Sequence, residues 1–337
     1  MEENKEENLG QHNDSLEFKS RLPLEELCVA VAKIKTEIQK VIVGQEEMID
    51  LLLVAMLAKG HVLIEGVPGI AKTITSKLFS KTLQVGFSRI QFTPDLMPSD
   101  VLGTSILNMK QGEFEFKKGP IFSNLILIDE INRAPAKTQS ALFEVMEERQ
   151  VTVDGHTYVM DEPFMVLATQ NPIEQEGTYS LPEAQLDRFL FKIKLDYPTL
   201  DQEFDILKSH HARKSDAAID QVESVLDPES LKTFQQLTSE IGIEEKILKY
   251  IAQIVVKTRN HPNLYLGGSP RASLAIMNAS KASAAISGRD FVIPEDVKKV
   301  VVPALGHRII LSPEREMEGM TTETVIDGIV QSVEIPR

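Results

Sequence analysis

Eight residues of the chain have the composition and spacing of a loop that binds phosphate. They are Gly66-Val67-Pro68-Gly69-Ile70-Ala71-Lys72-Thr73, and they lie between an apolar run, residues 61–65, and a helix-like stretch, residues 74–83. Glycines let successive backbone N–H groups turn towards anionic oxygens, while lysine supplies a positive charge and the threonine hydroxyl a ligand for Mg²⁺. The pattern predicts a site for a nucleoside triphosphate.

A second motif supplies the carboxylates that a nucleotide hydrolase needs. The apolar run of residues 125–128 ends in Asp129 and Glu130. We expect Asp129 to hold the hydration shell of Mg²⁺, and Glu130 to orient or deprotonate the attacking water. An acidic pair after a buried strand can also simply cap the next helix. Its combination with the glycine loop favours nucleotide hydrolysis.

The loop departs from the general consensus G-x-x-x-x-G-K-[ST] at one position, where Ala71 replaces the last glycine. Gly66 and Gly69 remain free to adopt positive φ. We expect Ala71 to be tolerated just inside the helix start if its φ stays negative.

Three further polar residues are candidates for contact with the γ-phosphate or the attacking water. Asn171 follows the apolar run 164–168, Arg188 precedes the run 189–195, and Arg271 lies in the first turn of a predicted helix. Arg188 has the chemistry of an arginine finger supplied by another subunit. The alternatives are an Asn-Pro turn, an ordinary surface arginine and a helix-end arginine without a ligand. The sequence predicts a solvated helix face for Gln139, Glu144 and Glu147.

The order of elements predicts an α/β fold in two domains. Apolar runs at 61–65, 87–92, 125–128, 164–168 and 189–195 alternate with helical patterns, which is typical of a parallel sheet covered on both faces. Ligands of such sheets bind at the carboxyl ends of the strands. We expect a disordered acidic tail over residues 1–22, a nucleotide-binding domain over 23–198 and an all-helical domain over 199–337.

Two hairpin-like segments interrupt this alternation. Residues 112–116 alternate apolar with charged side chains, and residues 151–158 centre on Asp154-Gly155, a strong two-residue hairpin signal. Both are compatible with plain surface hairpins, but their positions within the predicted domain also allow a functional role.

Composition narrows the class of protein. The 337 residues include 36 Lys and Arg against 50 Asp and Glu, a net charge of −14 that disfavours non-specific binding of nucleic acid. Cys28 is the only cysteine, so no disulfide within the chain is possible. The first residues lack a secretory signal pattern, and no apolar stretch approaches the ~20 residues that span a bilayer. We expect a cytoplasmic protein without a membrane span.

Several motifs together resemble the MoxR family of AAA+ ATPases over about residues 24–335. The match is carried by the glycine loop, whose Ala71 is usual in this family, and by four further segments: Leu127-Ile128-Asp129-Glu130-Ile131-Asn132-Arg133-Ala134, Ala168-Thr169-Gln170-Asn171-Pro172, Glu183-Ala184-Gln185-Leu186-Asp187-Arg188-Phe189 and Gly268-Ser269-Pro270-Arg271. Arg133 also matches the family, but neither its position nor the resemblance assigns it a role.

The resemblance implies an αβα ATPase core, a helical lid, and ATP with Mg²⁺ as ligands. The resemblance also implies roles for individual residues. Lys72 and Thr73, followed by Ile74, correspond to Walker A, and Asp129 and Glu130 correspond to Walker B. It further implies that Asn171 is sensor 1, that Arg188 is a finger acting in trans, that Arg271 is sensor 2, and that Val43-Gly44-Gln45 lies near adenine. The hairpins correspond to the family's helix-2 and pre-sensor-1 insertions, which are associated with a central pore or a client.

By the same resemblance, such proteins form rings, often hexamers, that work with partners carrying von Willebrand factor A domains in complex assembly, activation or metal insertion. We therefore expect a chaperone-like ATPase that remodels a protein client. Two alternatives remain open, namely a DNA-acting AAA+ motor and a nucleotide-dependent binding switch that turns over slowly.

Overall fold

The computed structural model describes residues 22–110, 112–171, 179, 181–212 and 218–336. The predicted acidic tail, except its last residue, therefore lies outside the described residues, as does Pro172.

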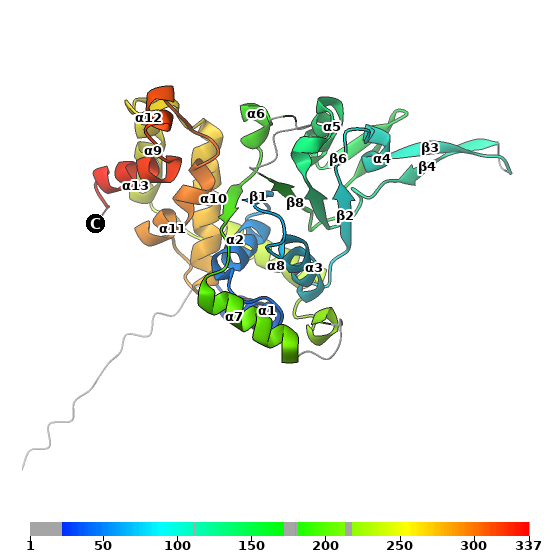
Figure 1. Cartoon of the computed structure of the whole chain (residues 1–337), viewed down its shortest axis with the longest axis horizontal. Helices are drawn as coiled ribbons and strands as arrows, with labels where there is room; N and C mark the ends of the chain where they lie inside the picture. The colour runs from blue at the N-terminus through cyan, green and yellow to red at the C-terminus, as the bar shows by residue number, and fades with distance from the viewer. Residues whose placement is uncertain (1–21, 111, 172–178, 180, 213–217, 337) are drawn as a thin grey trace, which may run out of the picture.

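A five-stranded parallel sheet, in the order β2-β5-β8-β1-β9, forms the centre of the N-terminal part (Figure 1). Its strands are β1 (Val62–Gly66), β2 (Phe87–Gln91), β5 (Leu125–Asp129), β8 (Met165–Gln170) and β9 (Phe191–Leu195). Val62 pairs with Leu167 on one side and with Phe191 on the other. The predicted parallel sheet is confirmed, and all strands end at the same edge.

Alternate strand residues pack on opposite faces of the sheet. Val62 and Ile64 belong to one apolar cluster, whereas Leu63 belongs to the other. The first cluster includes residues of α1 (Glu25–Gln39), α2 (Glu46–Leu57) and α3 (Lys72–Thr82), and the second includes residues of α5 (Ala136–Glu148). Strands buried on both faces need this continuous apolar character, which is the pattern seen in the sequence.

Both predicted hairpins form. The first pairs β3 (Gly103–Asn108) with β4 (Glu113–Lys118) after the short helix α4 (Pro98–Leu102), and it extends away from the body (Figure 1). The second pairs β6 (Gln150–Val153) with β7 (His156–Val159). Asp154 and Gly155 both have positive φ, as the predicted two-residue turn requires. The sequence pattern had located only β4 of the first hairpin.

The C-terminal part is helical with one exception. Its helices are α7 (Leu200–Ala212), η2 (Ala218–Gln221), α8 (Pro228–Ser239), α9 (Glu245–Arg259), α10 (Pro270–Ile286), α11 (Pro294–Leu305), α12 (Pro313–Met317) and α13 (Thr322–Ser332). The antiparallel pair of β10 (Leu264–Leu266) and β11 (Ile310–Leu311) corrects the expectation of an all-helical region. Strands of two or three residues are too short to give a periodic signal. Among the described residues, no helix has the length and apolar character that crossing a membrane requires.

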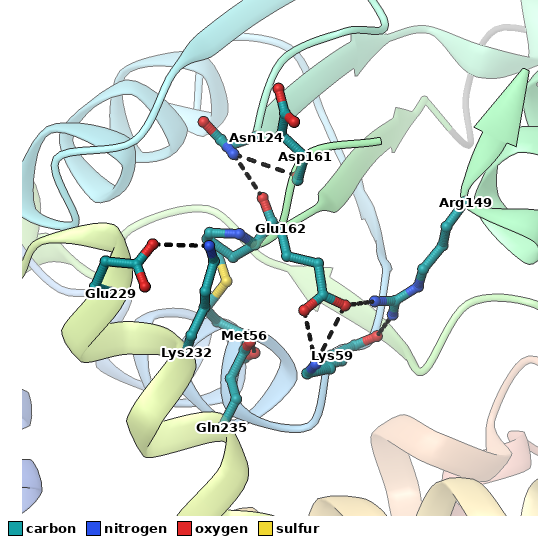
Figure 2. Close-up of polar contacts among 10 residues, drawn as sticks. Met56, Lys59, Asn124, Arg149, Asp161, Glu162, Glu229, Lys232 and Gln235 are labelled. Carbon is teal, nitrogen blue, oxygen red and sulfur yellow. Dashed lines mark hydrogen bonds and ion pairs between the residues drawn. The ribbon is translucent and has the colours of Figure 1, made fainter. Parts of the chain in front are cut away.

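The helical part packs directly on the sheet layer. α10 contacts α1 and α2, and one apolar cluster runs through both parts. Figure 2 shows a second junction, where Gln235 Nε2 of α8 donates to the Met56 carbonyl at 2.7 Å. Beside it, within the N-terminal part, the Glu162 carboxylate accepts from Lys59 and Arg149. A domain boundary at residue 198 stays a prediction.

His61 anchors the start of the central strand. Its buried ring accepts at Nδ1 from the Val166 backbone N–H at 3.0 Å, so Nε2 carries the proton and donates to the Met146 carbonyl at 3.1 Å. Burial lowers the pKa of His61 to about 4, from an ordinary value of 6.5. The ring is therefore neutral in the folded protein at neutral pH.

We predict that His61 makes the protein sensitive to acid. The unfolded chain binds a proton near pH 6.5 and the folded chain does not, so stability is full above that pH and is lost as the pH falls towards 4. Between pH 6.5 and 5 the free energy of unfolding should fall by about 2 kcal/mol through this residue. Denaturant titrations across this range test the expectation, and His61→Asn, which does not titrate, should show a shallower pH slope. Equal slopes would contradict it.

Candidate functional site

The glycine loop lies between the end of β1 and the start of α3, as predicted. Helix α3 begins at Lys72, two residues earlier than the sequence pattern indicated. The backbone N–H groups of its first turn have no partners within the helix and form, with the positive end of the helix dipole, a site for an anion. The loop is therefore placed as a phosphate cradle at the carboxyl edge of the sheet.

Two expectations about this loop need correction. Gly66 does not adopt positive φ; it is needed because a Cβ there would lie 2.6 Å from the Ile70 side chain and 3.0 Å from the Leu195 carbonyl oxygen. Ala71 has φ of 61°, not the negative value we expected, and Gly69 has 88°. The left-handed conformation at Ala71 explains why the general consensus places glycine there, since a Cβ is strained in that region.

Lys72 points back into the loop. Its Nζ donates to the Gly66 carbonyl at 2.6 Å, so the ammonium lies within the cradle. Partial burial lowers the pKa of Lys72, while the nearby carboxylates Asp129 and Glu130 raise it. Thr73 is the second residue of α3. The Lys72 ammonium therefore interacts electrostatically with both carboxylates.

Asp129 is the last residue of β5 and is buried. Its Oδ2 accepts from Arg89 Nε of β2 at 2.6 Å, and its Oδ1 accepts from Thr169 Oγ1 of β8 at 3.3 Å. Sequence reasoning missed Arg89 and Thr169, because each contacts Asp129 only through pairing of strands distant in sequence.

Glu130 is held by two side chains. Gln91 Nε2 donates to its Oε2 at 2.8 Å, and Arg133 Nε lies 2.9 Å from the same oxygen. Glu130 also has φ of 58° and donates its backbone N–H to Thr169 Oγ1 at 3.0 Å. Arg133, to which the sequence assigned no role, is thus an ion-pair partner of the candidate catalytic carboxylate.

Asn171 directly follows β8, which lies between β5 and β1. Because of this strand order, Asn171 lies between the acidic pair and the glycine loop, at the edge where a triphosphate would bind. The residue is buried. This position agrees with the predicted convergence of polar groups at the strand ends.

A cavity of about 660 Å³ adjoins the glycine loop. Residues 41–43 and 45–48 line it together with Pro68, Gly69 and residues of α7. Gln45 Nε2 donates to the Ile70 carbonyl at 2.6 Å, which ties this segment to the loop. The position suits the nucleoside end of a ligand whose phosphates lie in the cradle, and the contact of Val43 and Gln45 with such a ligand stays a prediction.

The residues at the strand ends fit Mg²⁺ bound together with phosphates. Among the described residues, no cluster of three or more His, Cys, Asp or Glu could hold a metal by itself. Mg²⁺ usually takes one or two protein oxygens and completes its shell with substrate phosphates and water. The Thr73 hydroxyl and the Asp129 carboxylate are hard oxygen donors of this kind.

Arg188 lies at the opposite edge of the sheet from the glycine loop. It precedes β9, whose first residue pairs with the first residue of β1, whereas the loop follows the last residue of β1. The strands alone separate the two by about 13 Å. Arg188 Nη1 instead donates to the Phe143 carbonyl at 2.9 Å and to Glu147 Oε2 at 3.2 Å.

Arg271 lies at the same distant edge. Its Nη2 donates to Glu147 Oε1 at 2.7 Å, so one carboxylate binds both arginines. We had expected a solvated face for Gln139, Glu144 and Glu147. The expectation was wrong for Gln139, which is buried and donates to the Ile131 carbonyl. Glu147 is exposed as expected, although it binds both arginines. Glu144 is also exposed, as expected.

Comparisons with known proteins agree with this arrangement. Residues 61–191 match the ATPase family associated with various cellular activities (AAA), and residues 256–329 match the AAA lid domain. A Bacillus subtilis protein of uncharacterized function, YeaC, is 47% identical over 316 residues that cover 93% of this chain and 97% of YeaC. The chaperone MoxR1 of Mycobacterium tuberculosis is 43% identical over 310 residues, which cover 89% of this chain and 81% of MoxR1. The chain belongs to the MoxR family of AAA+ ATPases.

A solved structure supports the fold of this MoxR-family chain. The crystal structure of a candidate ATPase from Cytophaga hutchinsonii is 43% identical and superposes with a TM-score of 0.85, covering 93% of this chain and 97% of that one. The α/β P-loop core followed by a helical lid is thus confirmed.

A buried polar junction connects the two arginine-bearing segments of the MoxR-family chain. Asp187, next to Arg188, accepts from Arg308 Nε at 2.7 Å and from Ser269 Oγ at 2.9 Å. Ser269 is the N-cap of α10, the helix that carries Arg271. Since Arg308 is buried and also donates to the Phe189 carbonyl at 2.6 Å, the lid is fixed to the segment before β9.

The strain at Ala71 generates a prediction. Ala71→Gly should change the free energy of unfolding by less than about 1 kcal/mol, because relief of left-handed strain offsets the greater entropy of glycine in the unfolded chain. Gly69→Ala should destabilise by roughly 1 kcal/mol or more, although the glycine has open space for a Cβ. Thermal unfolding without nucleotide compares the two. Equal losses in both variants would contradict the assigned backbone conformations.

Proposed function

We propose that this chain is a Mg²⁺-dependent ATPase that acts as a head-to-tail ring and remodels a protein client. The observation that supports it best is the separation of the polar groups. The cradle, Asp129, Glu130 and Asn171 lie at the carboxyl edge of the sheet, whereas Arg188 and Arg271 lie together at the amino edge. A complete site therefore requires two copies of the chain.

In the proposed site, the loop N–H groups and Lys72 bind the phosphates of ATP, while Val43, Gly44 and Gln45 border the nucleoside. Thr73 and Asp129 hold Mg²⁺, which neutralises charge on the phosphate oxygens when bound. Phosphoryl transfer needs little covalent help from the protein, so positioning and charge stabilisation supply most of the rate.

Glu130 orients or deprotonates the attacking water in this proposal, and Asn171 contributes an amide beside it. The contacts of Gln91 and Arg133 with the Glu130 carboxylate support a positioned rather than a freely rotating group.

Arg188 and Arg271 act on the ATP of the neighbouring subunit. An interface between two different edges of one molecule is heterologous, and such interfaces close into rings when the rotation permits. We propose that the ring is a hexamer, because the family that this chain resembles often forms hexamers. Arginine fingers supplied in trans are worth several orders of magnitude in rate.

The client is proposed to be a protein, for example one that carries a von Willebrand factor A domain. The relative named chaperone MoxR1 supports a chaperone-like role, and we propose that this chain acts in the cytoplasm. The net charge of −14 disfavours a DNA-acting motor, because phosphate contacts need local positive charge. Metal insertion into a client is one form that such remodelling would take.

We predict that Glu130→Gln binds ATP with near wild-type affinity but hydrolyses it at least 100-fold more slowly, because the amide cannot accept the proton of water. Glu144→Gln, an exposed substitution on α5, is the matched control and should leave turnover unchanged. Fluorescent ATP titration and phosphate release measure the two properties. A hydrolysis rate near wild type would contradict the role of Glu130. If Glu130→Gln also activates a client fully, a slow binding switch replaces the motor.

Trans action predicts complementation between inactive subunits. Arg188→Ala should retain ATP but lose most hydrolysis, and Lys72→Ala should lose ATP binding. Mixing them should restore part of the activity, since Lys72→Ala subunits supply an intact Arg188 to sites with an intact Lys72. Steady-state ATPase assays over a range of mixing ratios test this. No recovery in mixed assemblies that form normally would count against Arg188 as the finger.

A further inference from the structure

We propose that the outward face of helix α7 binds the arginine-bearing face of a second copy of this chain. This inference rests on the proposed trans arrangement, which brings a second copy to the edge where α7 lies. It adds a specific apolar contact that neither the ATPase motifs nor the comparisons assign.

Helix α7 has almost no packing of its own. None of residues 200–211 is buried, and Leu200, Phe204 and Leu207 are 85%, 63% and 62% exposed. Their spacing of four and three residues places them on one stripe of the helix. Isolated exposed apolar residues are common, but a stripe on one helix marks a contact surface. A helix of this length is marginal in water unless a face is packed.

The other side of α7 faces the nucleotide cavity. Gln202 and Ile206 line this cavity together with Pro68 and Gly69. At 3.6 residues per turn, these two residues lie on the side of α7 opposite the apolar stripe. The stripe is therefore directed away from the cavity. Helix α7 lies at the end of the molecule opposite α6 (Glu183–Leu186), the helix that ends two residues before Arg188 (Figure 1).

The matching surface of the second copy is defined here as the arginine face: Arg188, Tyr265, Arg271 and Leu274. Leu274 lies one turn after Arg271 on α10 and is 56% exposed. Tyr265 of β10 is 78% exposed, and β10 ends three residues before the N-cap of α10. Apolar side chains thus adjoin the arginines that must reach the neighbour's phosphate.

Charge also favours this pairing over others. Helix α7 carries three exposed carboxylates, Asp201, Glu203 and Asp205, against the single lysine Lys208, so it is acidic overall, and the arginine face is cationic. A head-to-tail interface needs two different complementary surfaces at opposite ends of one molecule. The α7 stripe and the arginine face meet this requirement, whereas two α7 stripes would bring like charges together.

The first test replaces the stripe. Phe204→Ser/Leu207→Ser should bind ATP within twofold of wild type as a monomer and unfold at the same temperature, since neither residue is buried. Its ATP-dependent assembly, measured by light scattering after size-exclusion chromatography, should need at least tenfold more protein. The control His210→Ser changes one exposed polar residue of α7 outside the stripe and should assemble as wild type. Normal assembly of the stripe variant would overturn the proposal.

The second test identifies the occupant by cross-linking. In a Cys28→Ser background, which has no other cysteine, Leu207→Cys and Tyr265→Cys proteins are mixed with ATP and a short bis-maleimide. Cross-linked dimers should form in the mixture and at least tenfold less in either protein alone. Equal cross-linking in Leu207→Cys alone would indicate a symmetric contact and overturn the proposal.

The two proposals fail in different ways. If wild type never assembles with ATP, both the ring and the α7 contact are wrong. If wild type assembles and mixing restores activity to the Arg188 and Lys72 variants, but the stripe variant assembles normally, the ring stands and only the α7 contact is wrong. In that case α7 is free to bind a different protein.

Discussion

The parallel register of β1 with β8 and β9 is the constraint on which the site depends. Together with the parallel pairing of β5 and β8, it places the ends of β1, β5 and β8 at one edge, where the glycine loop, the acidic pair and Asn171 meet. The same register places the residue before β9, Arg188, at the other edge. A parallel sheet cannot bring both ends of a strand to one ligand. The strand order that gathers the glycine loop and the acidic pair at one edge therefore keeps Arg188 of the same chain away from them.

Polar groups hold both arginines in place at the amino edge of the sheet. Glu147 binds both guanidinium groups, and the junction of Asp187, Ser269 and Arg308 fixes the lid to the segment before β9. Breaking a buried ion pair such as Arg308–Asp187 costs about 3–5 kcal/mol, because an unpaired charge remains. These contacts tie the lid to the segment before β9, so a shift of the lid would also change the position of Arg188.

Local patterns predicted most of this fold, and contacts between distant residues account for what was missed. Apolar runs gave all five sheet strands, and capping residues gave the start of α10 at Pro270. The roles of Arg89, Gln91 and Glu147 depend on side chains 39 to 124 residues away, for which a single sequence has no signal. The positive φ of Ala71 also escaped prediction, because composition indicates that a loop is present but not the backbone angles that each residue adopts.

In the proposed ring, nucleotide binding and contact with the neighbouring copy would be coupled through α7, which borders the cavity beside the glycine loop. Each subunit carries a net charge of −14, so copies repel one another at long range and assembly needs strong local complementarity. ATP adds further negative charge at the carboxyl edge, which increases the attraction for the arginines of the next subunit. Since α7 borders the nucleotide cavity on one side and is exposed on the other, ordering of α7 by nucleotide would favour the contact with the neighbour. By linkage, the neighbour must then strengthen nucleotide binding by the same factor.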